Sequence, residues 1–231
     1  MKKTLFPILL IICYQWTFSQ DTITKKIDSL YKEDQFYAGF TYNLLNNKPE
    51  EVSQSGFSTG FYLGFIKDMP LNKRRNFSIG IGLGYATNSF NQNMLISKDI
   101  NENINYSILD DSSVSYSRNK FSTNLIELPI EFRWRTSTAT TYDFWRIYTG
   151  FKLGYIFTHT AKYKGDLGNF KYKDITDLNV LQYGLTLSAG YSTWNFHLYY
   201  GLNNIFNNDA TLNGEQINMK ELKIGLMFYI L

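Results

Sequence analysis

The sequence predicts an all-β fold: an eight-stranded antiparallel transmembrane β-barrel with a polar, glycine-rich lumen and an apolar exterior. From Phe36 onward, apolar residues recur at every second position, which is the period of a β-strand. After the N-terminus, no stretch holds 18 consecutive apolar residues, so entry into a membrane would need strands closed into a barrel. Aromatic residues make up 17% of the chain, as suits a wall flanked by aromatic girdles.

Eight segments alternate in this way, and none carries a charged residue on its apolar face. They span residues 36–44, 57–65, 77–85, 126–134, 145–157, 181–191, 196–202 and 222–230. In the same order, their apolar faces include Phe36 and Phe40; Phe57, Phe61 and Phe65; Phe77 and Ile81; Ile126 and Trp134; Trp145 and Phe151; Leu187 and Tyr191; Phe196 and Leu198; Leu226 and Ile230. Pro129 interrupts the fourth segment, and a closed sheet has no free edge to accept a proline. We therefore expect a bulge or a lost ladder hydrogen bond there.

The glycines indicate which face lies inside. Of the 16 glycines, 13 fall in these segments or directly before one of them, and all 13 share the polar face. They are Gly39, Gly56, Gly60, Gly64, Gly80, Gly82, Gly84, Gly150, Gly154, Gly184, Gly190, Gly201 and Gly225. The interior of an eight-stranded barrel is only just wide enough for side chains, so glycine belongs on the crowded inner side. A soluble barrel, the alternative, would crowd Phe, Trp and Ile into the narrow lumen instead.

The lengths of the connections predict which end of the barrel faces the periplasm. From the third segment on, the long polar connections 88–120, 160–179 and 206–219 alternate with the short ones 136–143 and 192–195. Outer-membrane barrels have short periplasmic turns and long outer loops, which places both termini on the periplasmic side of the cell outer membrane. The first two connections, near 46–54 and 67–76, show no difference in length. The longest connection, 88–120, is expected to extend a strand over 114–121 and is a candidate recognition surface.

The N-terminus reads as a targeting segment. Lys2 and Lys3 precede a short apolar run that ends at Cys13, so residues 1–19 are predicted to be a signal peptide. Lipidation at Cys13 is a weaker alternative, because bulky Ile11 and Ile12 precede it. Residues 20–33 are expected to form a short periplasmic helix or tether, and 34–231 the barrel. With one cysteine, two histidines and a nearly neutral mature chain, we predict no cofactor, no metal site and no nucleic-acid partner.

Charged residues on the lumen face are the candidate functional residues. Glu127, Glu131, Arg133, Arg146 and Lys152 fall on the fourth and fifth segments, which should pair across a short turn. A register that sets Glu127 opposite Lys152 would set Arg133 opposite Arg146. One interpretation is a solute filter. The favoured one is a structural lumen charge network, because buried charges require partners.

The only cluster of three basic residues in the sequence, residues 73–75, lies in the second connection and reads as a solvated turn. A lipid-modifying enzyme would need a His beside a nucleophile and an acidic residue near one membrane interface. His159 and His197 are predicted at opposite ends of the barrel and cannot share a site. No catalytic residue is therefore assigned, and His197 is expected to be a lumen hydrogen-bonding group.

Several stretches resemble a known family. Glu127–Trp134 resembles the "E-I/L-P" strand of the PorT-like outer-membrane barrels of Bacteroidota, in which the proline recurs. Residues 148–155, 177–184 and 190–191 resemble the glycine-bearing strands that follow it, and 199–205 matches the pattern Y-x-G-L-x-N-I. The resemblance implies an eight-stranded barrel. The founding member is tied to protein secretion through the type IX system, while most relatives have no assigned role.

Together these observations predict a non-enzymatic outer-membrane protein with a structural or accessory role, linked through the resemblance to secretion. The expected partners are outer-membrane lipid, the barrel-assembly machinery and a secretion-system or surface protein. A small-solute porin is the alternative, and a lipid-modifying enzyme is a weaker one.

Overall fold

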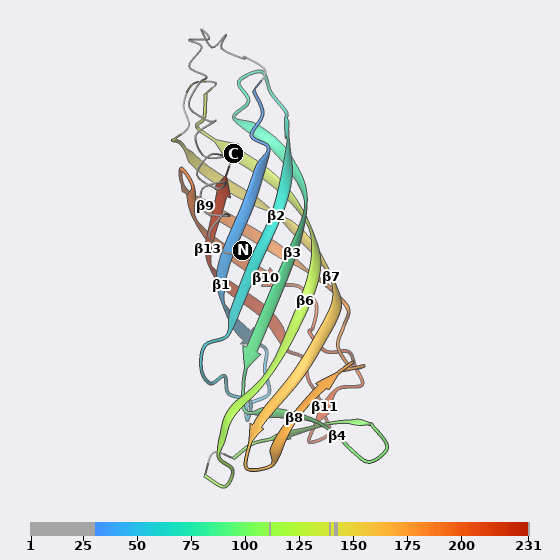
Figure 1. Cartoon of the computed structure of the whole chain (residues 1–231). Coiled ribbons are helices and arrows are strands. Elements are labelled where there is room, and N and C mark those ends of the chain that lie inside the picture. The colour runs from blue at the N-terminus through green and yellow to red at the C-terminus, as the bar shows by residue number, and fades with distance from the viewer. Residues whose placement is uncertain (1–30, 111, 139, 141–142, 231) are drawn as a thin grey trace, which may run out of the picture.

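The computed structural model describes residues 31–110, 112–138, 140 and 143–230, and it confirms the predicted fold class. Eight antiparallel strands close into a barrel in the order β1-β2-β3-β6-β7-β9-β10-β13, with β13 pairing back to β1 (Figure 1). The barrel strands are β1 (Gln35–Asn46), β2 (Thr59–Pro70), β3 (Phe77–Asn91), β6 (Tyr116–Arg135), β7 (Trp145–Gly165), β9 (Leu181–Tyr191), β10 (Trp194–Gly201) and β13 (Lys220–Ile230). Within the described ranges, the chain has no helical segment with the length and apolar character needed to cross a membrane.

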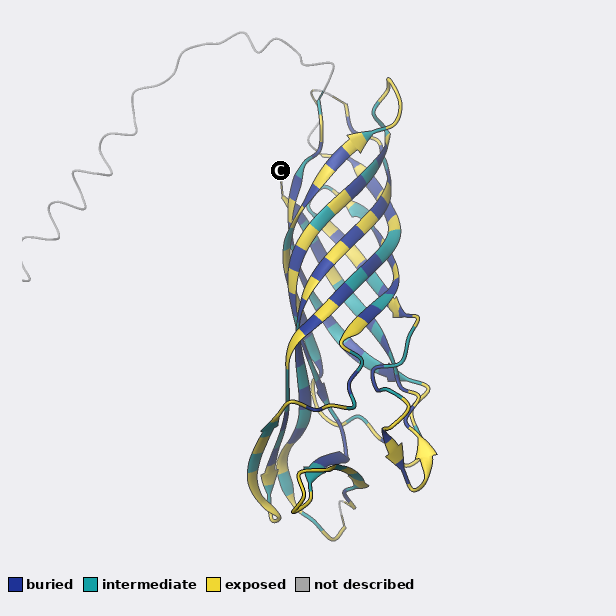
Figure 2. Cartoon of the chain, turned by 90° about the vertical axis from the view of Figure 1, so that its right-hand side faces the viewer, coloured by how far each residue is buried: buried dark blue, intermediate teal, exposed yellow. Residues whose placement is uncertain are grey.

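The predicted orientation of the two faces is confirmed. Buried and exposed residues alternate along the barrel strands (Figure 2). Phe61 and Ile81 are 52% and 43% exposed on the outer wall, whereas Arg146 is 2% exposed in the lumen. The apolar face therefore meets the surroundings, and the ionic groups are enclosed by the sheet, as in a barrel that spans lipid.

Glycine makes room for large side chains in the lumen. The ring of Tyr37 lies over Gly64 and Gly84, and a Cβ at either position would overlap it. Tyr37 points inward together with Tyr62, Tyr148 and Tyr229, which belong to a buried cluster inside the barrel. The interior is thus packed with aromatic rings as well as charges. Gly56 departs from the prediction, because it precedes β2 and has a φ of 72°.

The first two connections differ in length, contrary to the sequence-based expectation. β2 continues to Pro70, so the first connection spans 47–58 and the second only 71–76. The connections from β2 to β3, from β6 to β7 and from β9 to β10 all start and finish at one end of the barrel, where β1 begins and β13 ends. We call this end the turn end, and the opposite end the loop end. Short and long connections therefore alternate around the whole barrel.

The long connections at the loop end carry structure of their own. β6 and β7 run past the barrel as a pair, and β7 also pairs with β8 (Gly168–Lys173), which forms a three-stranded ribbon (Figure 1). The expected strand extension over 114–121 is confirmed from Tyr116 onward. Two hairpins, β4 (Met94–Lys98) with β5 (Ile104–Ile108) and β11 (Thr211–Leu212) with β12 (Glu215–Gln216), complete this end. A buried apolar cluster that includes Phe90, Phe121 and Phe206 lies beneath them.

Three irregularities interrupt the ladders of β6, and one of them, between Tyr116 and Arg118, lies near the end of the ribbon. Paired positions between β3 and β6 run from Ile81–Ile130 to Gly84–Glu127 and omit the rung that would contain Pro129, as expected. On the other side of β6, the register with β7 shifts at Asn124, where Phe157 is the extra residue of β7. Such a bulge reverses which residues of a strand face outward.

Two predicted segments cannot be compared in full with the structure. The signal peptide (1–19) and most of the helix or tether (20–33) lie outside the described residues. Residues 31–34 are described and form neither helix nor strand. They lead directly into β1 at the turn end.

Candidate functional site: the charged interior of the barrel

The five charged residues predicted to line the lumen are all buried inside the barrel. They are Glu127, Glu131, Arg133, Arg146 and Lys152. Each comes from β6 or β7, where the two-residue period turns alternate side chains inward. They fall into two groups, one at the turn end and one nearer the loop end.

The group at the turn end is organised around Asp68. Its carboxylate accepts two hydrogen bonds from Arg135, at 2.8 and 2.7 Å, in the bidentate geometry that suits guanidinium. Arg133 lies 3.3 Å from the same carboxylate and donates from Nε to Glu131 at 2.9 Å. Ser78 donates a further hydrogen bond to Asp68 at 2.6 Å. One carboxylate therefore serves two buried arginines.

Arg146 is held differently. Its guanidinium lies 4.4 Å from the ring centre of Phe144 and within 6 Å of Tyr148 and Tyr229. No carboxylate among the described residues forms an ion pair with it, and its Nε and Nη1 have no hydrogen-bond partner. Aromatic faces attract cations, more strongly when both are removed from water. These three aromatic rings are therefore the main partners of the Arg146 charge.

The second group lies nearer the loop end. Lys152 pairs with Glu127 at 3.1 Å, and Lys223 pairs with Glu221 at 2.7 Å. Both ammonium groups also lie within 6 Å of the same two rings, Tyr62 and Tyr199. The second pair thus repeats the arrangement of the first on the opposite wall of the barrel.

The predicted register is wrong by two residues, yet one predicted pair forms. Glu127 lies opposite Gly154, and Lys152 lies opposite Pro129. The ion pair between them is diagonal, which the length of a lysine side chain permits. Arg133 lies opposite Tyr148 and not opposite Arg146, whose partner in the ladder is Arg135.

Asp68 is the residue that the sequence-based prediction missed. The alternation predicts that the second segment ends at Phe65, which places Asp68 in the second connection, near 67–76. It nevertheless shares the parity of Gly60 and Gly64, and extending the alternation through Lys67 and Met69 would have placed it in the lumen. Parity also marked Glu221 and Lys223 as polar-face residues, but nothing in the sequence indicated that they pair with each other.

The segment before β1 crosses the turn end of the lumen. The Glu33 carbonyl accepts a hydrogen bond from Arg133 at 3.3 Å, and its backbone N–H donates to Asp68 at 3.3 Å. Arg75 donates to the Tyr31 carbonyl at 2.7 Å. Burial raises the pKa of the Glu33 carboxyl, and the positive charges of Arg135 and Arg146 oppose that rise. The backbone of Glu33 therefore binds the charge network from outside the strands.

The two histidines are not neighbours. His197 is buried in the lumen, and its Nδ1 lies 2.7 Å from Ser188 Oγ. His159 lies at the loop end, where its Nδ1 accepts a hydrogen bond from the Ile175 N–H at 3.0 Å. The His197–Ser188 pair is enclosed by the lumen, because both side chains are buried.

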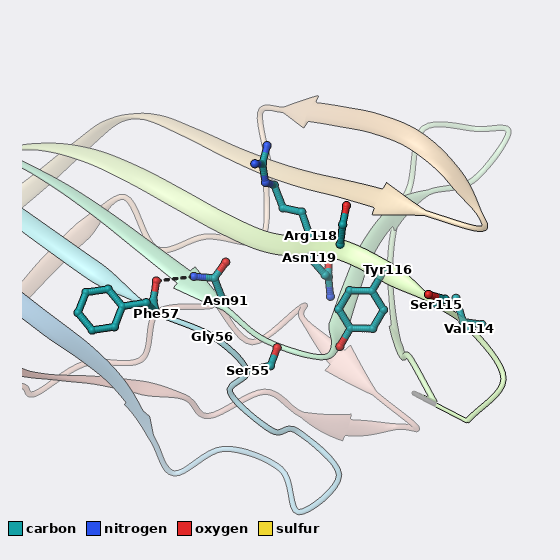
Figure 3. Close-up of a pocket in the computed structure, with 10 residues that line it drawn as sticks. Ser55, Gly56, Phe57, Asn91, Val114, Ser115, Tyr116, Arg118 and Asn119 are labelled. Atoms are coloured by element: carbon teal, nitrogen blue, oxygen red, sulfur yellow. Dashed lines mark hydrogen bonds between the residues drawn. The ribbon is translucent and has the colours of Figure 1, made fainter.

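A hollow of about 420 Å³ opens at the loop end. It is lined by Ser55, Gly56, Phe57, Asn91 and residues 114–119. Figure 3 shows the Asn91 side chain bonded to the Phe57 carbonyl, a distance of 2.7 Å. Arg118 extends across the neighbouring strand in the same view, while Asn119 points to the opposite side of β6.

Comparison with known proteins identifies the family. Residues 18–207 match the outer membrane protein beta-barrel domain. The chain belongs to this family. It is therefore an outer-membrane β-barrel protein.

No curated protein sequence matches the chain. Among solved structures, it is similar to Ail, the attachment invasion locus protein of Yersinia pestis, with 11% sequence identity. The match covers 87% of this chain and 99% of that chain, with a TM-score of 0.36. At that score, the likeness adds nothing to the fold established by strand pairing.

Proposed function

We propose that the protein is a non-enzymatic, structural or accessory component of the outer membrane whose lumen does not conduct solutes. The observation that carries this proposal is the filling of the lumen by buried aromatic rings and by charges, most of which pair with each other. Arg133 and Arg135 have fully buried side chains bound to Asp68. A water-filled channel would instead leave such groups hydrated.

Buried ion pairs are weak evidence for stability by themselves, because desolvation offsets much of the attraction. Their arrangement is more informative. The group at the turn end joins strands that do not pair with each other. Arg135 of β6 reaches Asp68 of β2 across β3, and Tyr229 of β13, on the opposite wall, donates to Glu131 of β6 at 3.2 Å. The network therefore acts as a structural plug, which favours this function over a small-solute porin.

The orientation belongs to this proposal. The short connections and both ends of the described chain lie at the turn end, which supports a periplasmic position for that end. The expected partners are then outer-membrane lipid around the wall and the barrel-assembly machinery during insertion. The PorT-like resemblance of Glu127–Trp134 supports an accessory role in protein secretion, with a secretion-system or surface protein as partner.

Planar-bilayer recording tests whether the lumen conducts. The full-length mature protein, reconstituted at low density, is expected to give no steady current, whereas a general porin in the same bilayer gives stepwise conductance. The matched variant Glu131→Ala with Arg133→Ala removes part of the plug and should introduce leak currents. Steady unitary conductance of the wild type, with ion selectivity reversed by Lys152→Glu, would instead establish the porin alternative.

The secretion link requires a separate measurement. Deletion of the gene in its native host should reduce the amount of secreted proteins in the medium, with restoration by the wild-type gene. Unchanged secretion, together with a non-conducting barrel, would restrict the role to a structural one. Affinity capture from outer membranes would identify the partner.

A further inference from the structure

The outer face of β6 and β7 changes character along its length. On β6, Leu128 and Ile126 face outward in the lipid-facing wall, and the same parity continues through Ser122 to Lys120 and Arg118. On β7, odd-numbered residues face outward up to Phe157. After the bulge at Phe157 the even-numbered ones do, including Lys162 and Lys164. The bulge therefore brings the lysines of β7 onto the face that carries those of β6.

Strand pairing aligns these cations into rows. Lys120 lies opposite Lys162, which lies opposite Lys171 of β8, so three lysines form one rung. Arg118 lies opposite Lys164 two residues further along β6, in the next rung whose side chains point to the same face. Lys173 extends the array on β8. We call these six residues the basic face; they are Arg118, Lys120, Lys162, Lys164, Lys171 and Lys173.

Within the described part of the chain, the basic face forms no ion pair. Among the described residues, no carboxylate lies within ion-pair distance of any of its six members. Like charges directly opposite each other across a sheet are destabilising. The ribbon is nevertheless ordered by its other face, where Tyr163 stacks on Phe170 with ring centres 4.9 Å apart, beside Leu95 and Leu109. Repulsion between like charges is thus repeated along the ribbon, and this indicates that an anionic ligand from outside the chain binds there.

The position of the basic face indicates what that ligand is. Ile126 lies in one rung with the aromatic residues Tyr85 and Tyr155 on the outer wall. Lys120 follows six residues further along β6, which at ~3.3 Å per residue and a strand tilt of ~40° is about 15 Å further along the barrel axis. Aromatic girdles mark the membrane interface. The basic face therefore lies just beyond that interface, above the lipid that surrounds the same wall.

We propose that the basic face binds phosphorylated headgroups of outer-leaflet lipids. The inference rests on the proposed function for one point, the outward position of the loop end. Several cations in neighbouring rungs suit a ligand that presents several phosphates, and each Lys or Arg near an anionic surface contributes to binding. Arg118 also borders the hollow at Ser55 and Asn91, so sugar carrying those phosphates has a polar surface beside it.

The test uses the full mature protein in zwitterionic detergent and three probes: phosphorylated lipopolysaccharide, the same material after dephosphorylation, and inorganic phosphate. The wild type should bind the phosphorylated lipid at least about tenfold more tightly than the dephosphorylated one, with affinity falling as salt rises. The triple variant K120Q/K162Q/K171Q should lose at least about tenfold in affinity. Equal binding of both lipids, or an unaffected triple variant, would overturn the proposal.

A matched control shows whether weaker binding comes from loss of the basic face or only from the lower net charge of the protein. K32Q/K67Q/K73Q removes the same charge from exposed lysines at the turn end and should bind like the wild type. Lys162→Glu should weaken binding more than Lys162→Gln, with folding of each variant verified by the heat-dependent shift in gel mobility. Displacement of the phosphorylated lipid by millimolar inorganic phosphate with equal affinity per phosphate would assign the site to a soluble anion and overturn the lipid assignment.

The orientation is tested independently of binding. Lys171→Cys should react on intact cells with a maleimide that cannot cross the outer membrane. Labelling only after permeabilisation would overturn the orientation in the proposed function, whatever the binding assay gives. Labelling on intact cells together with failed lipid binding would leave the proposed function standing and reject the basic face as a lipid site.

Discussion

β6 and β7 carry charged residues in two places, and the two places follow different rules. Inside the barrel, Arg133 and Lys152 meet carboxylates from the same molecule. On the outer ribbon, Lys120 and Lys162 face each other across the sheet with no carboxylate beside them. A charge removed from water must find its partner within the fold, because the cost of leaving it alone is several kcal/mol. A charge in water is under no such constraint, so an unpaired array there can be kept for a partner outside the chain.

The comparison predicts opposite signs for charge removal in the two places. Removing an interior charge should destabilise the barrel, whereas removing a ribbon lysine should stabilise it slightly in the absence of ligand. The largest effect is expected where one group serves several partners, and the smallest where charges are exposed.

Asp68→Ala should have the largest effect. It leaves Arg133 and Arg135 buried without their shared carboxylate, and breaking a buried pair in this way costs about 3–5 kcal/mol. Urea unfolding of the refolded protein in lipid vesicles measures the loss. Glu102→Ala, which removes the exposed ion pair to Lys98, is the control and should cost under ~1 kcal/mol. Equal losses in the two variants would contradict the central role of Asp68.

Glu127→Leu should cost about 3 kcal/mol, because Lys152 then remains buried without its carboxylate. Adding Lys152→Met to that variant should restore most of the stability, since a buried ion pair replaced by apolar groups is often nearly neutral. A double-mutant cycle on the same unfolding transition gives the coupling. Purely additive losses would show that the diagonal pair is not formed.

Gly84→Ala tests crowding in the lumen. A Cβ at this position would overlap the Tyr37 hydroxyl and displace the ring, and such overpacking costs about 1–3 kcal/mol. Thr87→Ala, on the outer face of the same strand, should stay within ~0.5 kcal/mol of the wild type. If Gly84→Ala is as stable as Thr87→Ala, the interior has more free space than the structure indicates.

The difference between the two places also explains what could be predicted from the sequence. Period and parity are local, so they placed Phe61 outside and Arg146 inside without knowledge of strand pairing. Asp68 was missed because the alternation was ended three residues too early. The ion pair of Glu127 with Lys152 was predicted from a wrong register, and it forms because long side chains also reach diagonal neighbours.

The basic face could not be found in this way. Residues 73–75 form the only run of three basic residues in the sequence. Lys120, Lys162 and Lys171, by contrast, are far apart along the chain and meet only through strand pairing. In addition, the bulge at Phe157 reverses the parity of β7, so alternation extended from Trp145 would have turned Lys162 inward. A one-residue irregularity of this kind leaves no clear mark in the hydrophobic pattern.

The smallest predicted effect, that of Lys162→Gln on stability, tests the contrast between interior and ribbon charges most directly. Lys162→Gln removes the central charge of the rung formed with Lys120 and Lys171, so it should raise the free energy of unfolding by about 0.2–1 kcal/mol in uncharged detergent. Raising the salt concentration should shrink this gain, because exposed charges are screened. Adding phosphorylated lipid should reverse its sign, since the wild type alone then has its full set of anion contacts. A loss of stability in uncharged detergent would mean that the lysine supports the ribbon itself, and the contrast between interior and exterior charge would fail at this position.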